Sequence, residues 1–156
     1  MLELDIPGFD QLQIEHLVMD FNGTLAMDGY LQLGVSEDLK CLAKSFYLHV
    51  VTADTNGRAA EQLGGLPVEL KVIPTEAQAE TKLEYIRELG ERKVIAIGNG
   101  RNDRLMLKSA GLGIAVIQKE GAAASAILNA DIVAPSISDA LDLIKHPRRL
   151  ISTLRS

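Results

Sequence analysis

The chain has 156 residues, a length that favours one domain with an ordinary hydrophobic core. Hydrophobic residues make up 47% of it, charged residues 24% and aromatic residues only 4%, which excludes a disordered or fibrous protein and predicts an aliphatic core. The formal net charge of −5 argues against nucleic acid as a partner, because binding a polyanion normally needs a basic face.

The single cysteine, Cys41, excludes an internal disulfide and fits a reducing cytosol. Its position in an amphipathic segment predicts a buried core thiol. No apolar run reaches the length of a membrane span, and the N-terminus lacks the basic-then-apolar order of a signal peptide. We therefore expect a soluble, cytoplasmic protein without a membrane partner. The basic tail, residues 146–156, is expected to be a solvated chain end.

The first half of the chain alternates apolar runs with segments of helical period. Residues 1–13, which contain Pro7 and Gly8, are expected to form an extra edge strand or an arm. The segment LAMDGYL is either a hairpin flap or a plain turn. The other expected elements are a strand over 14–20, a helix over 36–46 capped by Ser36, a strand over 47–52, a helix over 56–64 and a strand over 68–73.

The second half continues the same alternation and ends in a helix with Ser136 as its expected cap. The expected elements are a helix within 76–90, a strand over 93–98, a helix over 102–110, a strand over 111–117, a helix over 120–130, a strand over 131–134 and a helix over 136–146. Strands and helices in this order imply βαβ crossovers. The predicted fold is α/β, a Rossmann-like, mostly parallel sheet with helices on both faces.

In an open parallel sheet, ligands bind beyond the carboxyl ends of the strands. Polar residues gather at that edge after three of the expected strands. They are the turn Asp20-Phe21-Asn22-Gly23-Thr24, the segment Thr52-Ala53-Asp54 and the loop Gly98-Asn99-Gly100-Arg101-Asn102-Asp103. Asp20 is the strongest candidate for chemistry, because a carboxylate at a strand end can attack phosphorus and form an aspartyl phosphate. Its other interpretation is the polar end of a strand.

The residues around Asp20 could hold a phosphate group. The N–H groups of Gly23 and Thr24 can face phosphate oxygens from a tight turn, and Thr52 offers a hydroxyl, although threonine often ends strands for structural reasons. Lys82 would neutralise the negative charge that phosphate and Asp20 concentrate, but taken alone it is more often a surface lysine. A capping box of Thr81 and Glu84 would place Lys82 in the first turn of its helix; Thr75 and Gln78 form a competing cap.

The loop GNGRND allows close backbone approach and presents Asn99, Asn102 and Asp103 to a cation or to the attacking carboxylate. It fits neither a dinucleotide fingerprint nor a P-loop. The chain resembles the haloacid dehalogenase superfamily, which has four motifs in a fixed order. Their counterparts here are DFNGTL, a strand ending in Thr52, TKLEYIREL and IGNGRND. The likeness is strongest to the phosphorylation domain of P-type ATPases and its small soluble relatives, and it runs from about Val18 to Leu143.

The resemblance implies a Mg²⁺-dependent hydrolase or phosphatase. Asp20 would be the nucleophile, and Thr52 with Ala53, Lys82 and Asn102 would bind phosphate. Mg²⁺ would lie between Asp20, the carbonyl of Asn22 and the side chain of Asn99, with Asp103 holding its waters or Lys82. The substrate would be a small phosphorylated molecule or a phosphoprotein.

Two residues depart from the family pattern. Asn22 stands where many phosphatases of the superfamily carry a second aspartate, whose acid–base help is worth about 10²–10⁴-fold. Asn99 stands where a metal-binding aspartate is usual, which lowers the expected Mg²⁺ affinity. We therefore expect slow turnover. The alternatives are a degenerate module that binds phosphate or a partner without turnover, and a receiver-like signalling domain.

The segments between the expected elements are too short to hold a cap domain over the site. An uncapped site is open to solvent, so it suits large substrates or a second subunit that covers it. Self-association of the chain is therefore compatible with the sequence.

Overall fold

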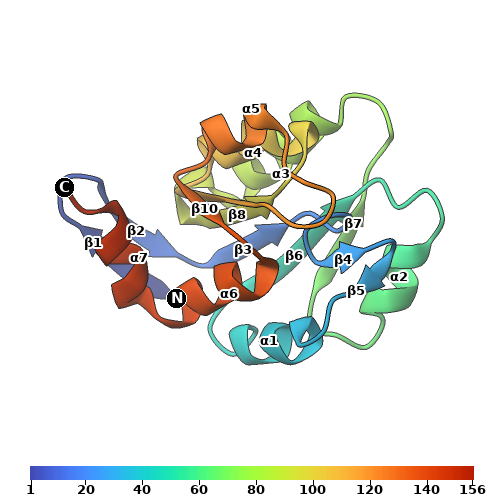
Figure 1. Cartoon of the computed structure of the whole chain (residues 1–156), viewed down its shortest axis with the longest axis horizontal. Helices are drawn as coiled ribbons and strands as arrows, with labels where there is room; N and C mark the ends of the chain where they lie inside the picture. Colours follow the sequence, from blue (N-terminus) through green and yellow to red (C-terminus); the bar gives the residue numbers. More distant parts are fainter.

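The structure, a computed structural model, describes residues 1–156 (Figure 1). Its centre is a six-stranded sheet in the order β10-β9-β8-β3-β6-β7, and every neighbouring pair is parallel. The strands are β3 (His16–Met19), β6 (Tyr47–Thr52), β7 (Glu69–Val72), β8 (Val94–Gly98), β9 (Leu112–Val116) and β10 (Ile132–Ala134). The predicted α/β class and parallel sheet are confirmed.

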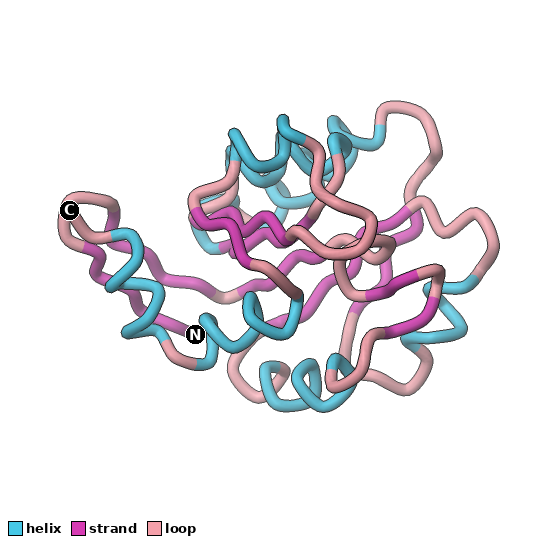
Figure 2. The backbone as a smooth tube through the Cα atoms, viewed as in Figure 1, coloured by secondary structure: helices cyan, strands magenta, loops and turns pink.

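Helices cover both faces of this sheet, as the tube in Figure 2 also shows. Alternate residues of the strands pack in opposite directions, since side chains of a strand have period two. In β3, Leu17 and Met19 join one core cluster and Val18 joins the other. The first cluster packs under α1 (Val35–Leu42), α2 (Arg58–Leu63) and α6 (Ile137–Lys145), and the second under α3 (Gln78–Leu89), α4 (Arg104–Ser109) and α5 (Ala124–Asn129).

Two short 3-10 turns complete the second half of the fold. Their bounds are Glu91–Lys93 and Arg101–Asp103. The second replaces the first turn of the helix expected over 102–110, so α4 begins only after Asp103. This arrangement leaves the GNGRND loop tightly wound at the carboxyl edge of β8.

The N-terminal arm forms a separate antiparallel hairpin of β1 (Leu2–Ile6) and β2 (Asp10–Ile14). The strand expected over 14–20 is therefore divided, because β2 ends before β3 begins. The tail is not solvated as expected: it forms α7 (Pro147–Leu154), which packs on β1 and fully buries Leu150. Its apolar residues recur at helical spacing, and the hairpin supplies the surface that covers them.

Local expectations for the helix starts were partly wrong. Ser136 caps α6 by accepting a hydrogen bond from the Asp139 N–H at 3.0 Å, as expected. Ser36 does not cap α1, because Gly34 with φ 85° occupies the cap position. Neither expected cap forms at α3, where Ala77 holds the cap position without a side-chain bond. Cys41 is exposed, not buried.

The segment after the first sheet strand folds as a hairpin of β4 (Ala26–Met27) and β5 (Tyr30–Leu31). This outcome selects the flap over the plain turn. In Figure 1 the hairpin lies beside α2, away from β1 and β2. None of the helices combines the length and the hydrophobicity that a membrane crossing requires.

Candidate active site

Asp20 follows β3 directly and lies at the carboxyl edge of the sheet, with 6% of its surface exposed. The turn after it depends on Gly23, whose φ of 79° is rarely adopted by other residues. A Cβ at this position would also overlap the side-chain amide of Asn99. The turn therefore brings two distant loops into contact.

The N–H groups of that turn are used within it. Gly23 donates to the carbonyl of Ala26 at 2.9 Å, and Thr24 donates to the carbonyl of Phe21 at 3.2 Å. The expectation that these two groups face phosphate is therefore corrected. The conformation of Gly23 and its close approach to Asn99 explain the glycine instead.

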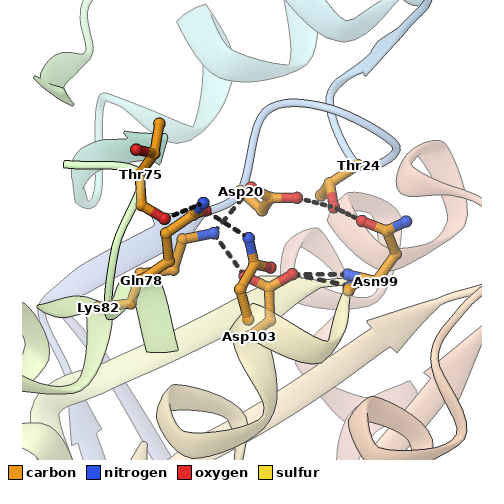
Figure 3. A network of polar contacts seen from close by, with 9 residues as sticks. Asp20, Thr24, Thr75, Gln78, Lys82, Asn99 and Asp103 are labelled. Carbon is orange, nitrogen blue, oxygen red and sulfur yellow. Dashed lines mark hydrogen bonds and ion pairs between the residues drawn. The ribbon is translucent and has the colours of Figure 1, made fainter. Parts of the chain in front are cut away.

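Lys82 is completely buried and joins two carboxylates, as Figure 3 shows. Its Nζ lies 2.9 Å from Oδ1 of Asp20 and 2.8 Å from Oδ1 of Asp103. It occupies the second turn of α3, not the first, and is not a surface lysine. A buried ammonium is strongly disfavoured unless it is paired, so this arrangement indicates a requirement for positive charge beside Asp20.

Asp103 fixes Lys82 and the GNGRND loop together. Its second oxygen accepts hydrogen bonds from the backbone N–H of Asn99 at 3.1 Å and of Gly100 at 2.9 Å. Gly98 is required here because a Cβ would overlap the Asp103 carboxylate. Both oxygens of Asp103 thus have protein partners, which matches the role of holding Lys82 and leaves it poorly placed as a direct metal ligand.

Burial dominates the electrostatics of Asp20. Loss of solvent, together with the nearby charge of Asp103, raises the pKa of Asp20 to about 6, although Lys82 acts in the opposite direction. Burial alone would lower the pKa of Lys82, but the two carboxylates outweigh it and raise that pKa above its ordinary value. The lysine therefore remains charged, and Asp20 is ionised near neutral pH.

Several donors around Asp20 have no partner within the protein. The Thr52 hydroxyl makes no hydrogen bond although the residue is only 3% exposed. The backbone N–H groups of Asn22 and Ala53 also donate to no carbonyl. Three unengaged donors and one buried ammonium around a carboxylate suit a tetrahedral anion.

Oxygen atoms suitable for Mg²⁺ lie on the opposite side of Asp20. Thr24 Oγ1 approaches both Asp20 Oδ2 at 3.5 Å and Asn99 Oδ1 at 3.2 Å. Because one hydroxyl carries one proton, at least one of these oxygens lacks a donor. The Asn22 carbonyl accepts no backbone hydrogen bond. This set fits Mg²⁺, which uses one or two carboxylates and keeps waters or phosphate as its other ligands.

One expected phosphate-binding residue points elsewhere. The Asn102 side chain donates to Oε1 of Gln78 at 2.8 Å, and so contacts α3 and not Asp20. The Asn22 side chain is exposed to solvent. No group of three or more His, Cys, Asp or Glu side chains is arranged to hold a metal ion. A metal ion beside Asp20 would thus meet one carboxylate and neutral oxygens.

Two glutamines near the turn Asp20–Thr24, called the nucleophile turn after the candidate nucleophile that it carries, were not expected from the sequence. Nε2 of Gln118 donates to the carbonyl oxygens of Gly23 at 3.0 Å and of Thr24 at 2.9 Å. Gln32 donates to the same Thr24 oxygen at 2.9 Å. Gln118 itself accepts a hydrogen bond from the backbone N–H of Ile137 at 2.9 Å. No motif marks these residues, because their partners are backbone atoms far away in sequence.

Comparisons with known proteins agree with this geometry. The family model of haloacid dehalogenase-like hydrolases matches residues 70–140. An uncharacterized protein of Methanocaldococcus jannaschii is 51% identical over 47% of this chain and 84% of its own length. A haloacid dehalogenase superfamily (subfamily III A) hydrolase from Legionella pneumophila has a TM-score of 0.72 at 17% identity, over 90% of this chain and 87% of that one.

A second similar structure is 3-deoxy-D-manno-octulosonate 8-phosphate phosphatase from Moraxella catarrhalis, in complex with magnesium, phosphate and KDO. Its TM-score is 0.71 at 15% identity, over 91% of this chain and 94% of that one. The cobalt-bound phosphatase of the same kind from Haemophilus influenzae also has a TM-score of 0.71, at 14% identity, over 92% of this chain and 94% of that one. Together, the sheet order, the Asp20–Lys82–Asp103 arrangement and these matches show that the chain belongs to the haloacid dehalogenase-like hydrolases.

Proposed function

We propose that the protein is a Mg²⁺-dependent phosphatase that acts through an aspartyl phosphate on Asp20. The observation that carries this proposal is the completely buried ammonium of Lys82, 2.9 Å from the Asp20 carboxylate. Burying the Lys82 ammonium is energetically costly, so its presence supports a site that binds a second anion, such as phosphate, beside Asp20. The phosphatase activity of two similar structures supports the same reaction class.

The reaction divides into two displacements at phosphorus. An oxygen of Asp20 forms a bond to phosphorus, and the bond from phosphorus to the ester oxygen breaks. The leaving alcohol departs with that electron pair and takes a proton from solvent. A water oxygen then attacks the phosphorus of the aspartyl phosphate and loses a proton to solvent. The bond from phosphorus to the Asp20 oxygen breaks, which releases inorganic phosphate and restores the Asp20 carboxylate.

Lys82, the Thr52 hydroxyl and the N–H groups of Asn22 and Ala53 would hold the phosphoryl oxygens in both steps. Mg²⁺, when bound, would be held by Asp20, the Asn22 carbonyl and Asn99, and would neutralise charge on the transferring group. Asp103 keeps Lys82 in place through its 2.8 Å ion pair.

Asn22 limits the rate of this reaction. Its amide cannot protonate a leaving group or activate water, and the residue is exposed beside the site. Esters of acidic alcohols and acyl phosphates, whose leaving groups depart without a proton, are the expected best substrates. Without an acid–base group at position 22, the aspartyl phosphate should also be hydrolysed slowly. A long-lived phosphoenzyme is known from the P-type ATPases, whose motifs this chain resembles.

The second candidate function is a phosphate- or partner-binding module without turnover. Asn22 and Asn99 favour it, because each replaces a charged residue of the family pattern by a neutral one. The complete Asp20–Lys82–Asp103 arrangement favours the enzyme.

Hydrolysis of p-nitrophenyl phosphate, with Mg²⁺ and with EDTA, separates the two functions. We expect metal-dependent release of nitrophenolate that the substitution Asp20→Asn abolishes. The nitrophenolate ion leaves without an acid, so Asn22 does not mask activity in this assay. A rate no higher than that of Asp20→Asn would reject the enzyme and support the binding module.

A further inference from the structure

A hollow of about 340 Å³ opens beside Asn22. It is lined at one edge by Asn22, two residues after the nucleophile, and at another by Asp54, two residues after Thr52. The rest of its wall comes from the segment that follows Asp54, from the turn between β4 and β5, and from the loop after β9. The other lining residues are Asp28, Gly29, Thr55, Asn56, Arg58 and Glu120.

The wall of this hollow is polar throughout and mainly acidic. It contains no hydrophobic side chain, three carboxylates and one guanidinium. Small-molecule pockets are ordinarily lined mostly by apolar groups, so this lining is unusual. Asp28 and Glu120 have no salt-bridge or hydrogen-bond partner within the protein. Their charges are therefore not compensated before a ligand binds.

The third carboxylate is already engaged. Oδ1 of Asp54 accepts a hydrogen bond from the Ala59 N–H at 2.7 Å, and Oδ2 accepts one from the Ala60 N–H at 3.2 Å. Asp54 thus holds the start of α2, and it still adds negative charge to the hollow. Asp28 and Glu120 are the two acidic groups free to meet a ligand.

The hollow is held in shape by contacts between the β4–β5 hairpin and α2. The Arg58 guanidinium lies over the Tyr30 ring, 4.5 Å from its centroid. The Leu31 N–H donates to Oε1 of Gln62 at 3.0 Å. Gly29 packs so closely that a Cβ would lie 2.9 Å from Cγ of Arg58. The one cation of the hollow is therefore fixed against an aromatic ring, and its single charge offsets only part of the charge of the three carboxylates.

We propose that Asp28 and Glu120 determine substrate choice, selecting phosphate esters whose alcohol is rich in hydroxyl groups and carries no negative charge. This inference rests on the proposed phosphatase function. Carboxylates accept hydrogen bonds from hydroxyl or ammonium groups but repel another carboxylate. Repulsion matters most here because the phosphate, held by Lys82, fixes the alcohol against the acidic wall.

The inference separates this chain from the phosphatases that it resembles in fold. Their substrate, an octulosonate phosphate, is the ester of a sugar acid, as its name states. A carboxylate on the alcohol would meet Asp28 and Glu120 in this hollow. For unit charges at such separations, partly screened by water, we expect about a tenfold loss in kcat/KM.

Three phosphate esters on one six-carbon frame test the charge dependence. Glucose 6-phosphate is uncharged on its alcohol, glucosamine 6-phosphate adds an ammonium, and 6-phosphogluconate adds a carboxylate. We expect kcat/KM to be about tenfold lower for 6-phosphogluconate than for glucose 6-phosphate, and at least as high for glucosamine 6-phosphate. The differences should shrink in 1 M salt, because screening shortens the range of the interaction to about 3 Å.

The double variant Asp28→Asn/Glu120→Gln removes the two free charges without altering side-chain shape. Asparagine also tolerates the φ of 52° at position 28. We expect the ratio between 6-phosphogluconate and glucose 6-phosphate to approach one. Arg58→Gln should shift the ratio in the opposite direction. The control Glu3→Gln/Asp5→Asn removes two charges from exposed residues of β1, at the other end of the molecule, and should leave the ratio unchanged.

Binding to the Asp20→Asn variant, measured by calorimetry, gives a readout that does not need turnover. Weaker binding of 6-phosphogluconate than of glucose 6-phosphate, with the difference lost in the double variant, supports the inference. Equal binding of the three esters, or no binding of any of them, overturns it. The p-nitrophenyl phosphate assay shows which proposal has failed. If hydrolysis depends on Asp20 but the three esters do not differ, the phosphatase function stands and only the role of the hollow is rejected.

Discussion

The side-chain amide of Gln118 donates a hydrogen bond to the backbone carbonyl of Thr24 at 2.9 Å, across 94 positions of the chain. The same nitrogen also meets the Gly23 carbonyl at 3.0 Å. Two carbonyls of the nucleophile turn are thereby fixed from the loop after β9. Because the turn carries Asp20 and the Asn22 carbonyl, its orientation depends on a side chain that no catalytic motif contains.

The substitution Gln118→Glu tests this dependence. A carboxylate keeps the shape and the acceptor for the Ile137 N–H, but it places negative charge against two carbonyl oxygens. We expect the free energy of unfolding to fall by about 1–3 kcal/mol, since the Gly23 carbonyl loses its donor and the Thr24 carbonyl keeps only Gln32. We also expect Mg²⁺ to raise the melting temperature less than in the wild type.

Urea unfolding and thermal melts with and without Mg²⁺ measure both effects. Gln11→Glu, on the exposed side of β2, is the matched control. If Gln118→Glu and Gln11→Glu behave alike, the hydrogen bonds to the turn do not position it.

Lys82→Met should be strongly destabilising at neutral pH. The substitution leaves Asp20 and Asp103, both buried, without the cation that they share. Loss of one member of a buried pair typically costs about 3–5 kcal/mol. Lowering the pH to about 5 should restore part of the loss, because protonation then removes the unpaired negative charge.

Urea unfolding at pH 7.5 and pH 5 provides the measurement for Lys82→Met. The double variant Lys82→Met/Asp103→Asn removes one of the two orphaned charges and should recover stability relative to the single variant. A single variant with wild-type stability at pH 7.5 would contradict the charge balance inferred for the site.

A row of three polar side chains around the buried His49 predicts pH-dependent stability. His49, which is 4% exposed, meets His16 at 3.0 Å and the hydroxyl of Tyr85 at 2.7 Å. Burial, followed by the neighbouring His16, lowers the pKa of His49 in the folded protein. The unfolded chain then binds more protons below its ordinary pKa of about 6.5, so stability should fall as the pH drops below that value.

The measurement is the urea midpoint at pH 7.5 and at pH 5.5. His49→Gln should reduce the difference between the two midpoints, since it removes one proton-binding group. His146→Gln, which changes an exposed histidine after α6, is the control and should leave the difference as in the wild type. If the urea midpoint of His49→Gln falls as much as that of the wild type between pH 7.5 and pH 5.5, groups other than His49 cause the acid sensitivity.

Asn22→Asp should restore the missing acid and base. The side chain is exposed beside the site, so a carboxylate there does not have to be buried. General acid–base catalysis typically contributes about 10²–10⁴-fold, and the gain should be largest for alkyl esters with poor leaving groups. The ratio of rates for an alkyl phosphate and p-nitrophenyl phosphate is the quantity to measure. No gain for either ester would point to Asn99 as the limiting residue.

Much of the fold follows from local sequence patterns. The strand after residue 46, rich in aromatic and β-branched residues, is expected over 47–52 and occupies Tyr47–Thr52. Ser136 as a helix cap and the glycine-rich loop after β8 are also predictable, because residues close together in the sequence decide the backbone conformation at both places. Their positions at the sheet edge then follow from the parallel arrangement, because consecutive strands end on one side.

The errors have a common physical cause. The tail was expected to be solvated because its charges dominate a short segment, yet the hairpin of β1 and β2 buries Leu150. Asn102 was expected at the phosphate, but its side chain contacts Gln78. Its direction is set by the 3-10 turn before α4 in which it lies. Such choices depend on packing partners that lie far away in the chain.

The sequence by itself determined the α/β alternation, the nucleophile candidate at the end of β3 and the neutral side chains of Asn22 and Asn99, since these depend on residue identity and local period. Only the tertiary structure decided that Lys82, 62 positions after Asp20, lies completely buried between two carboxylates. It also decided that Gln118 holds the nucleophile turn and that Asp28 and Glu120 face one hollow. Charge burial and hydrogen bonding to backbone carbonyls are properties of positions in space, and no local pattern encodes them.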